Sequence, residues 1–153
     1  MENYTVQLVS KDDKEKIIEL LKIMHSEYDL FPLDERELED TIDRMINKTG
    51  GVIGVIKSGD RIEALIGLFL DKMWYSKQWF LSEVFTFVHQ DFRRSTRAKH
   101  LINYAKECAE KMNLPLLMGI TSNIRTEAKM KLYERQLDKM GSFFVHNKEC
   151  VGA

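Results

Sequence analysis

Prolines and cysteines are scarce in this sequence. Its 153 residues include two of each, and its formal net charge is −1. There is no Pro/Gly/Ser-rich stretch and no internal repeat, so we expect one domain over residues 1–153. Cys108 and Cys150 have neither the spacing of metal ligands nor a disulfide framework. We therefore expect free thiols, no metal site and a cytoplasmic protein.

Long hydrophobic runs are missing as well. The longest, such as ALIGLFL, are far too short to cross a bilayer. The first ten residues lack the basic-then-apolar layout of a signal peptide, so we expect no membrane partner. The nearly balanced charge gives no general attraction to nucleic acid. Such an attraction would have to come from a local patch.

Hydrophobic periodicity predicts the element order β-α-α-β-β-β-α-β-α-β. The first half comprises a short strand at 4–9, a helix after Asp12 and Asp13, and a second helix from about Asp34. Two apolar runs then flank Ser58-Gly59-Asp60, which predicts a hairpin. The second half comprises a strand at 79–88, a helix from about Thr96, a strand at 115–121, a helix at 125–139 and a last strand at 141–148.

The strand–helix–strand unit in the second half implies that the strands at 79–88 and 115–121 are parallel. The three strands before that helix follow one another closely and are expected to be antiparallel. The fold class is therefore α/β, with a mixed central β-sheet and helices on both faces.

Four cationic side chains gather where the strand at 79–88 leads into the next helix. They are Arg93, Arg94, Arg97 and Lys99, against the single carboxylate of Asp91. A helix N-terminus is already positive, so each added cation is unfavourable by about a few tenths of a kcal/mol. The arrangement is reasonable if an anion such as phosphate binds there. A solvated, charged loop is the alternative interpretation.

The segment VFTFVHQDFRRSTRAKHLINYAKECAEK resembles the acyl-coenzyme A binding motif of the GNAT superfamily of N-acetyltransferases. In that family a strand leads into an Arg/Gln-x-x-Gly-x-Gly/Ala turn and a helix. The turn here reads Arg93-Arg94-Ser95-Thr96-Arg97-Ala98, with Thr96 where the family most often has its first glycine. MGITSNIRTEAKMKLYERQLDKMG is similar to the family's second half. The resemblance covers almost the whole chain, most strongly from about 79 to 145, and implies a GNAT-like fold.

The resemblance implies an N-acetyltransferase that moves an acetyl group from acetyl-coenzyme A to a primary amine by direct attack in a ternary complex. The N–H groups of Phe87 and Val88 would hold the pantetheine and polarise the thioester carbonyl. Those of residues 94–98 would hold the pyrophosphate, and Asn123 would bond the pantetheine arm. The implied donor-binding residues are Phe87, Val88, Arg93, Arg94, Ser95, Thr96, Arg97, Ala98 and Asn123.

Two residues are candidates for proton transfer. By resemblance, Tyr133 is the general acid for the departing thiol, because its reference pKa of about 10 allows it to donate a proton. Glu83 is the candidate base. It lies at an odd position of its strand, on the same face as Leu81 and Phe85 in strict alternation, and desolvation there would raise its pKa. The alternatives are a half-buried aromatic for Tyr133 and a β-bulge that turns Glu83 to solvent.

Two other functions remain open at this point. One is a catalytically inactive member of the fold that binds acyl-coenzyme A or a protein partner, supported by Thr96. The other is a nucleic-acid-binding module that uses the basic turn with Phe92 and Tyr104. The net charge and the lack of a second basic stripe argue against it. The expected acceptor is a small-molecule or protein amine, and a homodimer is compatible with the family.

Overall fold

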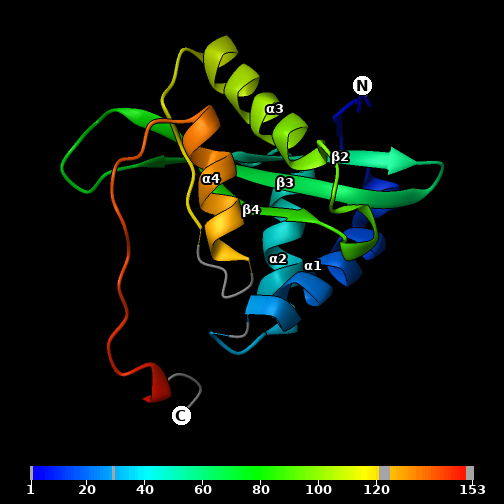
Figure 1. Cartoon of the computed structure of the whole chain (residues 1–153), viewed down its shortest axis with the longest axis horizontal. Coiled ribbons are helices and arrows are strands. Elements are labelled where there is room, and N and C mark those ends of the chain that lie inside the picture. The colour runs from blue at the N-terminus through cyan, green and yellow to red at the C-terminus, as the bar shows by residue number, and fades with distance from the viewer. Residues whose placement is uncertain (1, 29, 121–124, 151–153) are drawn as a thin grey trace.

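A computed structural model describes residues 2–28, 30–120 and 125–150 of the chain. Within them, one sheet has the strand order β1-β2-β3-β4-β5. Neighbours are antiparallel from β1 to β4, whereas β4 and β5 are parallel, as predicted (Figure 1). The strands are β1 (Gln7–Leu8), β2 (Gly51–Ser58), β3 (Arg61–Lys72), β4 (Trp79–Val88) and β5 (Leu116–Leu117).

Helices cover both faces of this sheet, as the sequence predicts. In Figure 1, α1 and α2 lie on one side of the strands and α3 lies on the other, while α4 is drawn in front of the left-hand part of the strands. The helices are α1 (Lys14–Tyr28), α2 (Glu35–Ile46), α3 (Arg97–Met112) and α4 (Thr126–Gln136). A short 3-10 turn, η2 (Gln90–Phe92), connects β4 to the arginine-rich turn. No helix of the described segments is both long and apolar enough to span a membrane.

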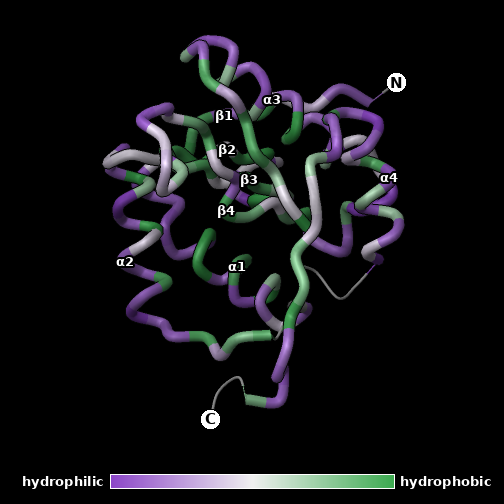
Figure 2. Tube along the Cα trace, turned by 90° about the vertical axis from the view of Figure 1, so that its left-hand side faces the viewer, coloured by the Kyte–Doolittle hydropathy of each residue, from purple (hydrophilic) through white to green (hydrophobic). Residues whose placement is uncertain are grey.

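Two hydrophobic clusters hold the layers together. One joins α1 and α2 to the sheet, with Ile17, Ile42 and Leu65 fully buried. The other joins α3 to the opposite face and includes Leu101 and Ile66. Figure 2 shows the apolar colour concentrated along the strands, while much of α2 is hydrophilic. Because a hydrophobic cluster packs on each face, the sheet holds the residues at the ends of its strands in fixed positions.

The hairpin between β2 and β3 is confirmed. Ser58 pairs with Arg61 across a two-residue turn. Gly59 has a φ of +60°, a left-handed conformation that glycine adopts without strain. Cys108 packs against the α3 cluster, as predicted, and burial raises the pKa of its thiol above the ordinary value. A thiol of that kind is a packing group, not a nucleophile.

Strict alternation along β4 is wrong, because the strand contains a β-bulge. Leu68 of β3 pairs with Glu83 and Gly67 pairs with Phe85, so Val84 is an extra residue. After the bulge, the odd-numbered side chains of β4 point to the opposite face of the sheet from the odd-numbered side chains before it. Leu81 packs on the α3 side, whereas Phe85 packs on the side of α1 and α2. A bulge re-aims the side chains beside it, and here it affects Glu83.

The predicted last strand at 141–148 is absent. The chain after α4 runs away from the sheet in Figure 1, and Phe143 and Phe144 are 90% and 95% exposed. A strand needs a paired neighbour, and β5, at the sheet edge, is only two residues long. After α4 the structure has only a short 3-10 turn, η3 (Lys148–Cys150), within the described residues. The helix α4 is also shorter than the 125–139 expected.

Candidate functional site

A cavity opens where β4 and β5 separate. Among the residues that the structure describes, these strands pair at Leu81–Leu116 and Ser82–Leu117 and nowhere else. Beyond this pairing a cavity of about 320 Å³ lies between the second half of β4, the arginine turn and α4. Its lining includes eight of the predicted site residues: Glu83, Phe87, Val88, Arg93, Arg94, Ser95, Ala98 and Tyr133. The open edge of β4 presents backbone groups that an extended polar chain can bond.

Glu83 lies at the bulge and faces this cavity, not open solvent. Its Oε1 accepts a hydrogen bond from the Gly119 N–H at 3.0 Å, and its Oε2 accepts one from the Thr86 hydroxyl. Desolvation raises the pKa of the Glu83 carboxyl above its ordinary 4.5, although these hydrogen bonds partly oppose the rise. The alternative interpretation, a β-bulge that turns Glu83 to solvent, is confirmed for the bulge and wrong for the direction. The Glu83 side chain lines the cavity.

Tyr133 joins Glu83 across the cavity. Its phenol donates a hydrogen bond to Glu83 Oε2 at 2.9 Å, linking α4 to β4 over 50 residues of sequence. Arg125, Lys129 and Tyr133 follow one another at intervals of four residues, so they share one face of the helix, and all three line the cavity. The structure thus brings the predicted acid and base into direct contact.

The arginine turn is less cationic than its sequence indicates, and Arg93 is the first reason. Its guanidinium pairs with Glu27 of α1 at 2.7 Å, and its Nε donates to the Val88 carbonyl at 3.0 Å. The guanidinium also lies over the Phe87 ring, 5.3 Å from the centroid. Arg93 therefore forms part of the cavity wall and contacts the end of β4, which is expected to hold the donor.

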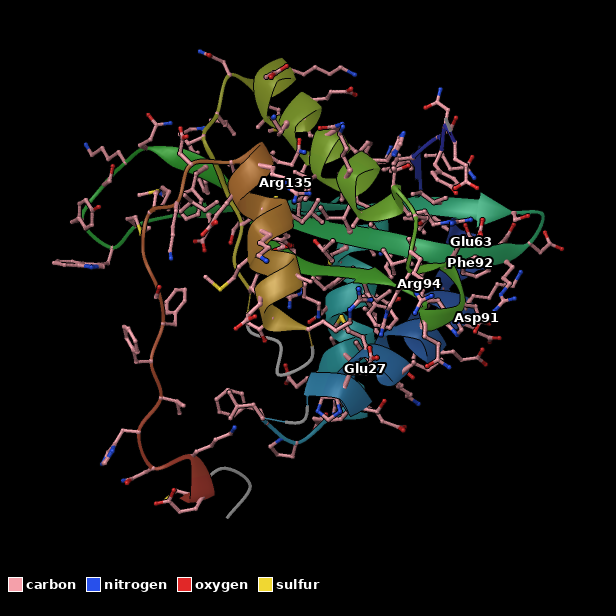
Figure 3. The ribbon with its side chains drawn as sticks, in the orientation of Figure 1. Glu27, Glu63, Asp91, Phe92, Arg94 and Arg135 are labelled. Atoms are coloured by element: carbon pink, nitrogen blue, oxygen red, sulfur yellow. The ribbon has the colours of Figure 1, made fainter. Side chains whose placement is uncertain are left out.

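Arg97 is the second reason. Its guanidinium pairs with Glu63 of β3 at 2.7 Å, with side-chain exposures of 12% and 6%. The guanidinium also lies over the rings of Tyr4 and Phe92, 4.1 and 4.7 Å from their centroids. Figure 3 shows Glu63 and Phe92 together at one end of the sheet, while Glu27 lies apart beside α1. The Arg97 side chain is thus largely buried and held by the fold, and its predicted contact with phosphate stays a prediction.

Arg94 is the exposed arginine of the turn. Among the described residues it makes no ion pair, and it lines both the cavity and a second hollow that adjoins it. Arg125, at the N-cap of α4, also lines both hollows and has a φ of 54°. A left-handed conformation is strained for arginine and persists only where surrounding structure enforces it. The two hollows share the lining residues Arg93, Arg94, Ser95 and Arg125, and we call this shared boundary the passage. Arg94 and Arg125 supply positive charge to it.

The remaining turn residues shape the start of α3. The Ser95 hydroxyl donates to the Phe92 carbonyl and accepts from the Arg97 N–H. Thr96 has a φ of −90°, so this position needs no glycine, and its side chain lines neither hollow. Thr96 therefore gives no support to an inactive protein. The first turn of α3 contains no acidic residue. Asn123 lies outside the described residues.

Several cavity residues were not predicted from the sequence. Thr86 lines the cavity next to the bulge, whereas Glu27, at the end of α1, contacts the site through its ion pair with Arg93. Neither contact leaves a local signal in the sequence. Lys129 could have been found, because it precedes Tyr133 by one helical turn. Within the described segments, no group of three or more acidic, histidine or cysteine side chains could hold a metal ion.

Comparisons of sequence give no match. No protein-family model matches the chain, and no curated protein sequence is significantly similar to it.

Comparisons of structure give many matches. One is to a predicted acetyltransferase from Clostridium acetobutylicum solved with acetyl-CoA, at a TM-score of 0.77 and 10% identity over 95% of this chain and 96% of that one. Another is to AAC(6')-Iy in complex with the bisubstrate analogue CoA-S-monomethyl-acetylneamine, at 0.72 and 15% identity over 97% and 100%. A third is to ribosomal-protein-alanine N-acetyltransferase from Brucella melitensis biovar Abortus 2308, at 0.70 and 14% identity over 94% and 99%. The chain therefore has the fold of these acetyltransferases, which confirms the predicted fold class.

Proposed function

We propose that residues 1–153 form a single acyltransferase domain, an N-acetyltransferase that uses acetyl-coenzyme A as its acyl donor. One observation carries the proposal. The Tyr133–Glu83 hydrogen bond of 2.9 Å lies in a cavity that opens between β4 and β5 and leads to the arginine turn. A proton donor, a carboxylate with a raised pKa and a cationic passage are the groups that acyl transfer from a phosphorylated thioester requires.

The chain offers a suitable surface for each part of the donor. The open edge of β4 at Phe87 and Val88 suits the amide-containing pantetheine arm, which can bond there as a neighbouring strand would. The first-turn N–H groups of α3 and the side chains of Arg94 and Arg125 suit the diphosphate and the ribose phosphate. Similar folds carry acetyl-CoA and a coenzyme A bisubstrate analogue, which supports this assignment.

The contact between Glu83 and Tyr133 suggests a proton path. The Glu83 carboxylate accepts a proton from the attacking amine, directly or through water, and the Tyr133 phenol gives its own proton to the departing sulfur. The hydrogen bond then returns a proton from Glu83 to Tyr133. A raised carboxyl pKa favours this path, because it brings the carboxyl group closer to the pKa of the amine it must deprotonate.

The acceptor is proposed only as a primary amine, on a small molecule or on a protein. The name of one structural neighbour specifies a ribosomal-protein alanine, so the fold accommodates a protein acceptor. Binding to nucleic acid loses support, because Glu27 and Glu63 neutralise two of the four cations on which that alternative rests. A cytoplasmic location and a homodimer are part of the same proposal.

The test is a thiol-release assay with acetyl-coenzyme A and a panel of primary amines. Tyr133→Phe keeps the ring but removes the phenolic proton, so we expect kcat to fall by about 10²-fold or more while the donor affinity changes little. Tyr104→Phe is the matched control, because that tyrosine packs in the α3 cluster away from the cavity lining. Full activity in Tyr133→Phe with a good acceptor would remove Tyr133 from the mechanism.

A further inference from the structure

Lys129 is a cavity residue that the proposed reaction leaves without a role. It lies in the first half of α4, one helical turn before Tyr133, on the same face of the helix. A helical turn rises about 5.4 Å, a distance that a lysine side chain can cross. The Lys129 amine can therefore reach the region around the Tyr133 hydroxyl and the Glu83 carboxylate, where the thioester would react.

The surroundings of Lys129 favour its neutral form. Burial lowers the pKa of the ammonium, and the nearby guanidinium groups of Arg93 and Arg125 lower it further, while Glu27 opposes them. The N-terminal end of the α4 dipole acts in the same direction as the arginines. Glu27 and Arg94 are both drawn on the same side of α4, to its right, in Figure 3. Charged groups thus face Lys129 from α1, from the arginine turn and from its own helix.

A neutral amine is the nucleophile in acyl transfer, whereas an ammonium is inert. An exposed lysine is almost entirely protonated at neutral pH, and each unit by which its pKa falls makes the neutral fraction about tenfold larger. Lys131, two residues further along α4, is exposed and is absent from the cavity lining. The helix therefore carries one lysine inside the site and a matched one outside it.

We propose that Lys129 is a site of self-acetylation, modified by the donor bound in its own cavity when no acceptor amine is present. The inference rests on the proposed function. The Lys129 Nζ lone pair attacks the thioester carbonyl carbon, the new C–N bond forms and the C–S bond breaks. The nitrogen loses one proton to Glu83, and the sulfur takes one from Tyr133. The products are Nε-acetyllysine and free coenzyme A, and the relay between Glu83 and Tyr133 restores both groups.

The modification has a structural consequence. An acetylated Lys129 carries no charge and adds a planar amide to a cavity of about 320 Å³. It also removes one cation from the cluster that faces the passage to the second hollow. We therefore expect the acetylated chain to bind the donor more weakly, so that the protein loses activity when it is held with the donor alone.

The experiment follows acetylation residue by residue. The full chain is incubated with acetyl-coenzyme A without an acceptor, and samples are quenched over time and cleaved after glutamate. Cleavage after Glu127 and Glu134 gives residues 128–134, which contain both Lys129 and Lys131. Fragment masses then separate the two lysines within one peptide. We expect Lys129 to be acetylated about tenfold faster than Lys131 or more, because of its larger neutral fraction and its proximity to the donor.

Two variants and one binding measurement make the result decisive. Tyr133→Phe should slow acetylation at Lys129 and leave Lys131 unchanged, whereas Lys129→Arg should abolish the fast phase. Donor binding is measured separately by calorimetry. If the donor binds and Lys129 is acetylated no faster than Lys131, self-acetylation is overturned and the proposed function stands. If the donor does not bind, both self-acetylation and the proposed function are overturned.

Discussion

Glu63 and Glu83 are carboxylates on neighbouring strands with opposite surroundings. Glu63 is 4% exposed and its partner is a guanidinium, that of Arg97 at 2.7 Å. Glu83 accepts its described hydrogen bonds from uncharged donors: an amide, a hydroxyl and a phenol. A cation beside a carboxylate stabilises its charge, whereas uncharged donors in a partly dry cavity leave its protonation sensitive to pH. One glutamate is therefore suited to hold the fold together and the other to move protons.

The same division runs through the arginine turn. Arg97 stabilises the fold, because its ion pair with Glu63 links the first residue of α3 to β3. Arg94, three residues earlier, is exposed on the passage between the two hollows. Arg93 lies between these extremes, since it is paired with Glu27 but still lines the cavity. Substitutions that separate stability from activity test this division.

The largest expected effect is on stability, from Arg97→Ala. Removing the guanidinium leaves the Glu63 carboxylate buried without its cation, which should lower the free energy of unfolding by about 3–5 kcal/mol. Chemical denaturation measures the change. The double variant Arg97→Met with Glu63→Leu should recover much of the loss, because no charge then stays buried. If the double variant is no more stable than Arg97→Ala, the ion pair is not the cause.

The next effect concerns Glu83→Gln, which keeps the shape of the side chain but cannot accept the proton. We expect kcat/KM to fall by about 10²-fold. In the native protein, kcat/KM should fall as the pH is lowered through the raised pKa of Glu83, because the base is the carboxylate form. That limb of the pH profile should disappear in Glu83→Gln. An unchanged profile would assign the titration to another group.

Glu83→Gln should also alter the dependence of stability on pH. The folded chain keeps the Glu83 proton to a higher pH than the unfolded chain does, so the folded state binds more protons in that interval. The free energy of unfolding contributed by Glu83 is therefore largest below the unfolded pKa, and is lost as the pH rises through the folded pKa. Denaturation midpoints across this range should show a flatter dependence in Glu83→Gln than in the native protein.

The smallest effect is on donor affinity, from Arg94→Ala. An exposed charge-assisted contact to phosphate contributes on the order of 1.4 kcal/mol, which corresponds to a tenfold weaker Kd. Stability should stay unchanged, in contrast to Arg97→Ala. Lys99→Ala is the matched control, since Lys99 is an exposed cation of the same segment that lines neither hollow. Equal losses of affinity in both variants would mean that only the general charge matters.

The sequence predicted the parts of the fold that depend on local pattern. The apolar stripes of α1, α2 and α3 are buried where the periodicity places them, and the hairpin turn at Gly59 forms as its composition predicts. The contact between Tyr133 and Glu83 was not predicted, because the resemblance indicated Tyr133 alone and the alternation of its strand indicated Glu83 alone. Phe143 and Phe144 showed that strand-like composition is insufficient when no neighbouring strand is available.

What the sequence could not predict depends on long-range contacts. The partners of Arg93 and Arg97 come from residues 66 and 34 positions away, so the run of arginines overstated the free charge of the turn. The bulge at Val84 depends on the pairing of β3 with β4, and strict alternation could not indicate it. The left-handed backbone of Arg125 is held by its surroundings, since arginine itself does not favour that conformation.

The most direct test of the central claim is amide hydrogen exchange with and without a saturating concentration of acetyl-coenzyme A. If the cavity between β4 and β5 binds the donor, the amide of Val88 at the open edge of β4 and those of residues 94–98 should exchange more slowly when the donor is present. The exposed connection between β3 and β4, at residues 73–78, should be unaffected. Unchanged exchange at the end of β4 and in the arginine turn would contradict the account.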